Sequence, residues 1–72
     1  MQLYRNLSND SGVHSFEIGI DYIQVNFSGT SRIYTYSYSS AGEIHIEQMK
    51  YLALSGKGLN SYINKHTKKL YE

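Results

Sequence analysis

Between Val13 and Tyr38 the chain alternates apolar and polar residues in three short runs. Alternation with a period of two is typical of a β-strand that buries one of its faces. The apolar rows are Phe16, Ile18 and Ile20; Ile23, Val25 and Phe27; and Tyr34, Tyr36 and Tyr38. The turn-forming segments GIDY and SGTS separate the runs, so residues 13–38 are predicted to form an antiparallel three-stranded meander.

The period changes after Ser40, where apolar residues recur at spacings of three and four. This pattern predicts a first helix over residues 40–56, opened by a capping box between Ser40 and Glu43 and ended by Gly56. Its core face carries Ile46, Met49, Leu52 and Ala53. A second helix is predicted over residues 58–68, started by Gly58 or Lys57, and its apolar face carries Leu59, Tyr62, Ile63 and His66.

These elements assemble most economically as one α+β domain over residues 1–72, with both helices on one face of the sheet. Residues 1–12 form a leader and a loop, because SNDSG at residues 8–12 has a turn composition. The last five residues, KKLYE, either continue as a tail or add a short C-terminal strand.

The tyrosine row of the third run is either a stacking platform for a ligand or one row of the core. A chain of 72 residues has little apolar material to spare, so Tyr34 and Tyr36 are predicted to face inward, with Tyr38 at the rim. The other sheet face then shows Glu17, Gln24, Asn26, Arg32 and Thr35. That face is polar and not basic, which disfavours a sheet platform for RNA.

The composition narrows the chemistry further. The chain has no cysteine, which excludes disulfides and thiolate metal sites, and no apolar run long enough to span a membrane. A cytoplasmic location is expected. Residues 1–49 contain two arginines and five acidic residues, whereas residues 50–72 contain five lysines and one glutamate. The C-terminal third is therefore either a basic contact surface or a solvated helix face.

Candidate catalytic and metal sites find little support in the sequence. His14, His45 and His66 do not have the spacing of metal ligands, and no pair of nucleophile and base is evident. We therefore expect neither a cofactor nor enzymatic activity. The SGKG segment at residues 55–58 is either a turn between helices or a weak contact for a phosphate group.

Three segments carry a resemblance to known proteins: SGVHSFEIGIDYIQVNF, the YTY of the third run, and SAGEIHIEQMKYLALSGKGLNSYINKH. Over residues 13–66 the chain resembles a group of short, stand-alone bacterial proteins. It is more loosely similar to the KTSC domain found at the C-terminus of some lysyl-tRNA synthetases. The Tyr-x-Tyr of that domain matches Tyr34 and Tyr36, and its helical Ala-x-Ser followed by Ile matches Ala53, Ser55 and Ile63.

The resemblance implies a small domain with a central Tyr-x-Tyr and, from the synthetase context, a role in contacting RNA. It supplies no catalytic residues. The chain departs from the family in having no proline after the Tyr-x-Tyr strand and in the position of the glycines that follow Ser55.

Two functions follow as hypotheses for a non-enzymatic binding module. The first is an accessory domain that contacts nucleic acid, RNA in particular, through the basic C-terminal face. The candidate residues are Lys50, Lys57, Lys65, Lys68 and Lys69. The second is a protein-interaction or self-associating module that uses tyrosines outside the core rows, which are Tyr4, Tyr22, Tyr51 and Tyr71.

Overall fold

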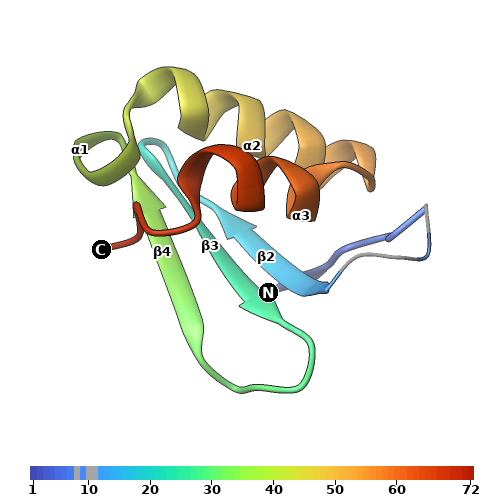
Figure 1. Ribbon diagram of the computed structural model, residues 1–72. Coiled ribbons are helices and arrows are strands. Elements are labelled where there is room, and N and C mark those ends of the chain that lie inside the picture. The colour runs from blue at the N-terminus through green and yellow to red at the C-terminus, as the bar shows by residue number, and fades with distance from the viewer. Residues whose placement is uncertain (8, 10–11) are drawn as a thin grey trace.

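The computed structural model describes residues 1–7, 9 and 12–72, and within them the chain forms a four-stranded antiparallel sheet with helices over one face (Figure 1). The strands pair in sequence order: β1 Gln2–Leu3, β2 Val13–Ile18, β3 Tyr22–Phe27 and β4 Ile33–Ser37. The helical part comprises α1 Tyr38–Ala41, α2 Glu43–Ser55, α3 Leu59–Tyr62 and the π-helical turn η1 Ile63–Thr67. The predicted α+β class and the antiparallel meander are confirmed.

The fourth strand is N-terminal. Gln2 pairs with Phe16 and Leu3 with Ser15, so part of the predicted leader is β1 at one edge of the sheet. The C-terminal segment touches the opposite edge by one hydrogen bond, in which the Glu72 amide donates to the Thr35 carbonyl at 2.7 Å. Of the loop predicted at residues 8–12, residues 8, 10 and 11 lie outside the described part of the chain.

The inward rows of the sheet form the core with the helices. Ile23 pairs with Tyr36 and Val25 with Tyr34, which brings the predicted rows of β3 and β4 side by side. Tyr36 is buried, Tyr34 is half-buried, and Ile46, Met49 and Leu59 close the core from the helical side. The prediction that Tyr34 and Tyr36 face inward is confirmed.

The prediction for Ile20 is wrong: its side chain is 93% exposed. Ile20 and Asp21 form the tip of the β2–β3 hairpin, which closes with the Gly19 amide donating to the Tyr22 carbonyl at 3.0 Å. The alternation therefore ends at Ile18, because a tight turn cannot continue the pleat of the strand. The Tyr22 ring covers Gly19, and a methyl group added to Gly19 would collide with that ring.

The predicted first helix is divided in two. Ser37, not Ser40, opens the helical region: its side chain accepts from the Ser40 amide, and the Ser40 hydroxyl accepts from the Ser37 amide. This capping box starts the single turn of α1, and Gly42 with φ of 92° then redirects the chain into α2. Glu43 is thus the first residue of α2, where its charge favours the positive end of the helix dipole.

The last helical segment differs from the prediction in its final turn. Leu59 and Ile63 are buried as predicted, but His66 is exposed and Thr67 takes the inward position. A π-helical turn contains one residue more than an α-helical turn. The next side chain to point inward after Ile63 is therefore Thr67, four residues on, and not His66, three residues on. Thr67 satisfies its hydroxyl by donating to the Met49 sulfur at 3.5 Å.

Candidate functional site

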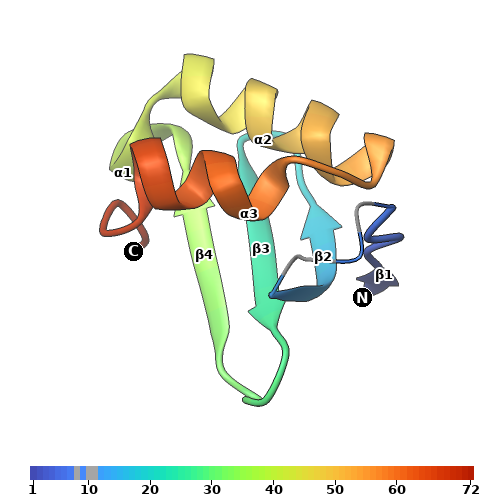
Figure 2. The ribbon, with the colours of Figure 1, turned by 45° about the vertical axis from the view of Figure 1, so that its right-hand side comes forward.

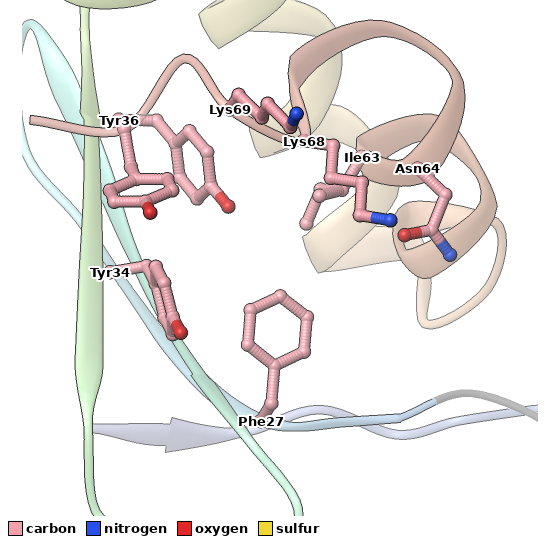
Figure 3. Close-up of a pocket in the computed structure, with 8 residues that line it drawn as sticks. Phe27, Tyr34, Tyr36, Ile63, Asn64, Lys68 and Lys69 are labelled. Carbon is pink, nitrogen blue, oxygen red and sulfur yellow. The ribbon is translucent and has the colours of Figure 1, made fainter.

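A cavity of about 310 Å³ lies between the β3–β4 side of the sheet and the end of the helical layer (Figure 3). Its lining comes from β3, β4, η1 and the C-terminal segment, and consists of Phe27, Tyr34, Tyr36, Ile63, Asn64, Lys68, Lys69 and Tyr71. We call it the aromatic pocket. Its volume is at the lower end of the range of about 300–1,000 Å³ that is usual for small-ligand sites.

Aromatic rings form one wall of the pocket. The Tyr34 ring meets Phe27 at 5.5 Å and Tyr71 at 4.9 Å between centroids, both edge to face, and Tyr36 meets Tyr71 at 6.2 Å. Two backbone hydrogen bonds hold Tyr71 there, since the Leu70 amide donates to the Thr67 carbonyl and Glu72 is bonded to β4. The tail therefore supplies a ring that the sheet alone does not have.

The phenol of Tyr36 stays protonated at physiological pH. Burial raises the pKa of Tyr36 to about 12, and the neighbouring Tyr34 and Tyr71 hydroxyls add to the shift. A protonated phenol is a hydrogen-bond donor and a poor base. The wall is therefore suited to holding a flat or apolar group rather than to moving a proton.

Cations surround this wall. Lys68 and Lys69 line the pocket and are exposed to solvent, and the Arg32 guanidinium carbon lies 5.0 Å from the centroid of the Tyr34 ring. A cage of aromatic rings alone favours a cationic ligand. Here the two lysines repel a cation, so the pocket favours a planar group that carries an anionic substituent.

The structure brings together two of the five lysines predicted to contact nucleic acid. Lys68 and Lys69 are in the pocket, and Lys65 is exposed on η1. Lys57 lies in the turn between α2 and α3, at the other end of the α3–η1 segment (Figure 2). Lys50 is half-buried and engaged, because its ammonium donates to Glu47 Oε2 and to the Ile20 carbonyl, both at 2.8 Å.

The four tyrosines predicted to lie outside the core are in four different settings. Tyr4 is a core residue, which corrects the prediction: it packs edge to face on Phe16, and its hydroxyl accepts from the Leu59 amide at 3.3 Å. Tyr22 is half-buried over Gly19. Tyr51 is freely exposed on α2, and Tyr71 is part of the aromatic pocket.

A second polar cluster joins α1 to α2. The Tyr38 hydroxyl donates to Glu47 Oε2 at 2.6 Å, and the same oxygen accepts from Lys50 and forms an ion pair with it. The hydrogen bond from Lys50, followed by that from Tyr38, holds the pKa of Glu47 below its usual value. The hydrogen bond to Glu47 raises the pKa of Tyr38 to about 12.

The lowered pKa of Glu47 predicts a pH-dependent contribution to stability. The ionised carboxylate stabilises the fold above its ordinary pKa, and that contribution is lost as the pH falls through the lowered value. We expect Glu47→Gln to melt at a modestly lower temperature than the wild type at about pH 7, and the gap to be smaller at about pH 3, which is below the ordinary pKa of a glutamate. Circular dichroism melts of both chains measure the gap. An equal gap at both pH values would contradict the assignment, because other carboxylates protonate identically in the two proteins.

The histidines at the helix interface form a packed ring cluster. His45 Nδ1 lies 2.7 Å from the Tyr62 hydroxyl, and the His45 and His66 rings stack at 5.6 Å. His45 is in the first turn of α2 and half-buried. Within residues 1–7, 9 and 12–72, no three His, Asp or Glu side chains come close enough to hold a metal ion.

The SGKG segment has the geometry of a turn. Gly56 has φ of 85° and ends α2 with its amide donating to the Leu52 carbonyl, and Gly58 has φ of 88° at the start of α3. A methyl group added to Gly56 would lie 2.9 Å from Arg5 Cβ. The Arg5 guanidinium also donates to the Leu54 and Ser55 carbonyls, and so stabilises the end of α2. Both glycines have positive φ angles, which fits the prediction of a turn between the helices.

The sequence did not indicate the pocket as a unit. Phe27, Asn64 and Ile63 become neighbours only when η1 packs beside β3 and β4, and Arg32 was assigned to the polar face of the sheet. The one signal in the sequence was the adjacency of two lysines and an aromatic ring in KKLYE. That signal suggests an anion site, but it does not indicate which strand the segment meets.

Comparison with known proteins does not assign the chain to a family. No family model matches the chain, and neither the curated proteins nor the solved structures contain a match. The fold and the pocket thus define a class only: a small α+β domain with an aromatic, cation-rimmed site. Among its described residues, no helix is long and apolar enough to cross a membrane. The KTSC resemblance over residues 13–66 stays a prediction from the sequence.

Proposed function

We propose that this protein is a non-enzymatic binding module that contacts single-stranded nucleic acid, RNA in particular, through the aromatic pocket. The observation that carries the proposal is the joint presence of Tyr34 and Tyr71 with Lys68 and Lys69 around one cavity. Single-strand binding sites combine aromatic rings for the bases with positive charge along the backbone.

In this proposal one unstacked base packs against the wall formed by Phe27, Tyr34 and Tyr71. A cavity of about 310 Å³ is large enough for one unstacked base with its sugar. The exposed ammonium groups of Lys68 and Lys69 meet the flanking phosphates, and Arg32 extends the positive rim beyond Tyr34. Duplexes keep their bases stacked, so they bind only through the lysines.

Affinity in this proposal is modest and falls moderately with salt. Two or three phosphate contacts release few counterions, and Glu72 places one negative charge beside the Lys68–Lys69 pair in sequence. The KTSC resemblance supports the same class of ligand through its synthetase context. The domain then acts as an accessory contact that adds to the affinity of another RNA-binding unit.

The test is a fluorescence anisotropy titration of labelled ten-nucleotide RNA and DNA single strands at low salt. We expect dissociation constants of tens to hundreds of micromolar and little binding of a duplex of the same length. Tyr34→Ala is expected to weaken single-strand binding about 5- to 100-fold, the usual value of one stacked base. The matched control is Tyr51→Ala, which removes an exposed tyrosine that does not line the pocket and is expected to leave binding unchanged.

Two results would overturn the proposal. One is the absence of saturable binding up to about 1 mM protein. The other is equal binding of single strands by the wild type and by a Tyr34→Ala protein whose circular dichroism spectrum shows a folded chain. Equal binding of a single strand and a duplex would reduce the pocket to a general polyanion contact and would also reject base recognition.

A further inference from the structure

The α2 helix is apolar on both sides. Ile46, Met49 and Ala53 face the core, as the sequence predicts. On the opposite side Ile44, Tyr51 and Leu54 are 84%, 67% and 54% exposed. Spacings of seven and three place these three residues on one side of a helix. A surface helix of a monomer usually has charged and polar residues there, so this outer stripe requires an explanation.

The stripe extends from the first turn of α2 to its last turn and beyond it, with the exposed polar residues 47 and 48 between Ile44 and Tyr51. Ile44 is in the first turn of α2, and Leu54 is at its end. Leu7 is exposed beside the end of the helix, where its amide donates to the Gly56 carbonyl at 2.7 Å. These four side chains expose roughly 500 Å² of apolar surface, near the upper limit for the largest patch on a typical monomer.

Charges of opposite sign lie at the two ends of the stripe. Glu43 is exposed at the start of α2, whereas the charge of Glu47 is already paired with Lys50. Lys57 and Arg5 are at the end of α2, where the Arg5 guanidinium donates to the last carbonyls of the helix. The charges of this surface are therefore complementary to those of a second copy whose α2 helix runs antiparallel. A copy in the same direction would place like charges together.

We propose that the outer stripe of α2 is the interface of a symmetric homodimer in which the two α2 helices pack antiparallel. A two-fold axis perpendicular to the helices, near Gln48 and Tyr51, brings Ile44 of one copy to Leu54 of the other. The same operation places Glu43 opposite Lys57 of the second copy, twice in each dimer, and opposes the two helix dipoles.

The dimer is weak and leaves the aromatic pocket open. A patch of roughly 500 Å² is smaller than the about 800 Å² that each partner contributes to a standard interface, so dissociation constants in the range of about 10 to 500 μM are expected. None of the stripe residues lines the pocket. The proposal is therefore independent of the proposed function, although a dimer presents two pockets to one nucleic-acid strand.

The first experiment is sedimentation velocity from about 10 μM to about 1 mM protein in about 50 mM salt. We expect the sedimentation coefficient to rise with concentration from that of a monomer to that of a dimer. Ile44→Glu is expected to weaken the association at least about tenfold, because it places a charge against the apolar side chain of Leu54 in the second copy. Ile44 is 84% exposed, so the variant folds normally and its monomer sediments like that of the wild type.

A charge exchange tests the antiparallel arrangement. Glu43→Lys and Lys57→Glu are each expected to weaken the dimer about three- to tenfold, and the double variant to return within about twofold of the wild type. The two residues are at opposite ends of a 13-residue helix, about 18 Å apart, and cannot pair within one chain. Glu17→Lys, the same charge change on the exposed sheet face, is the matched control and leaves association unchanged.

Three outcomes would overturn the proposal. A monomer that persists to about 1 mM rejects the homodimer and leaves the stripe to a different protein. A dimer that tolerates Ile44→Glu rejects this surface. A double variant as weak as the single variants rejects the antiparallel pairing. We expect Ile44→Glu to bind a short single-stranded oligonucleotide as the wild type does. Failure of the dimer proposal is therefore distinguishable from failure of the proposed function.

Discussion

Phe16→Ala is expected to leave the chain largely unfolded at 25 °C. Phe16 is 1% exposed and lies where β2 meets the core, with the Tyr4 ring edge to face at 6.5 Å. Truncating a buried phenylalanine to alanine costs about 3–5 kcal/mol, since it removes apolar packing and leaves a cavity. A domain of this size has roughly 3–5 kcal/mol of stability in total. The destabilisation therefore equals the whole stability of the fold.

Circular dichroism melts and the dispersion of amide signals in NMR spectra measure this effect. Phe16→Leu keeps most of the volume and is expected to cost less than about 1.5 kcal/mol, so it remains folded. Ile20→Ala is the control on the same hairpin: its side chain is 93% exposed, and we expect a change within about 0.5 kcal/mol. A cooperative melt of Phe16→Ala close to that of the wild type would contradict the assigned core.

Reversing both pocket lysines is expected to have the largest effect on ligand binding. A double variant, Lys68→Glu and Lys69→Glu, changes the rim of the aromatic pocket from cationic to anionic. Removing one lysine–phosphate interaction lowers affinity severalfold at low salt, and each glutamate adds repulsion. We expect single-strand binding to fall at least about 100-fold at about 50 mM salt, while the thermal stability changes little because both side chains are exposed.

The salt dependence separates a specific contact from a general one. For single strands, log K falls with log salt by about 0.7 for each phosphate contacted. Lys68→Gln with Lys69→Gln is therefore expected to reduce the magnitude of this slope by about 1.4, whereas Lys57→Gln leaves it unchanged. Lys57 is the matched control because it is exposed in the turn between α2 and α3 and absent from the pocket. If the double glutamine variant had the same salt slope as the wild type, the pocket lysines would not contact phosphate.

Local chemistry was sufficient to predict most of the elements. The period of two in residues 13–38 and the period of 3.6 after Ser40 correspond to β2, β3, β4 and α2, and Gly56 ends the helix in the left-handed conformation. These features depend on neighbours within four residues. Val13 and Phe16 are three residues apart, and strict alternation places such residues on opposite sides of a strand. They face the same side because a bulge between Val13 and Ser15 adds one residue to β2.

The errors have a common origin in contacts between distant segments. Tyr4 was predicted to lie outside the core, but β1 pairs with β2 and carries it inward, where its hydroxyl meets the Leu59 amide 55 residues later. His66 was predicted to face inward, yet the π-helical turn selects Thr67, whose hydroxyl reaches Met49 on α2. The competition between two adjacent residues for one buried position depends on the facing helix.

Periodicity and composition were enough to define the strands, the main helix, the inward direction of Tyr34 and Tyr36, and the concentration of lysines in the last third of the chain. These properties are encoded locally, in the spacing and type of neighbouring residues. The folded arrangement was needed to establish which lysines share a site with aromatic rings and which side of α2 stays uncovered. The first depends on how η1 and the tail dock beside β4, and the second on how α2 packs against the sheet and the α3–η1 segment. Both are set by packing between segments far apart in the chain.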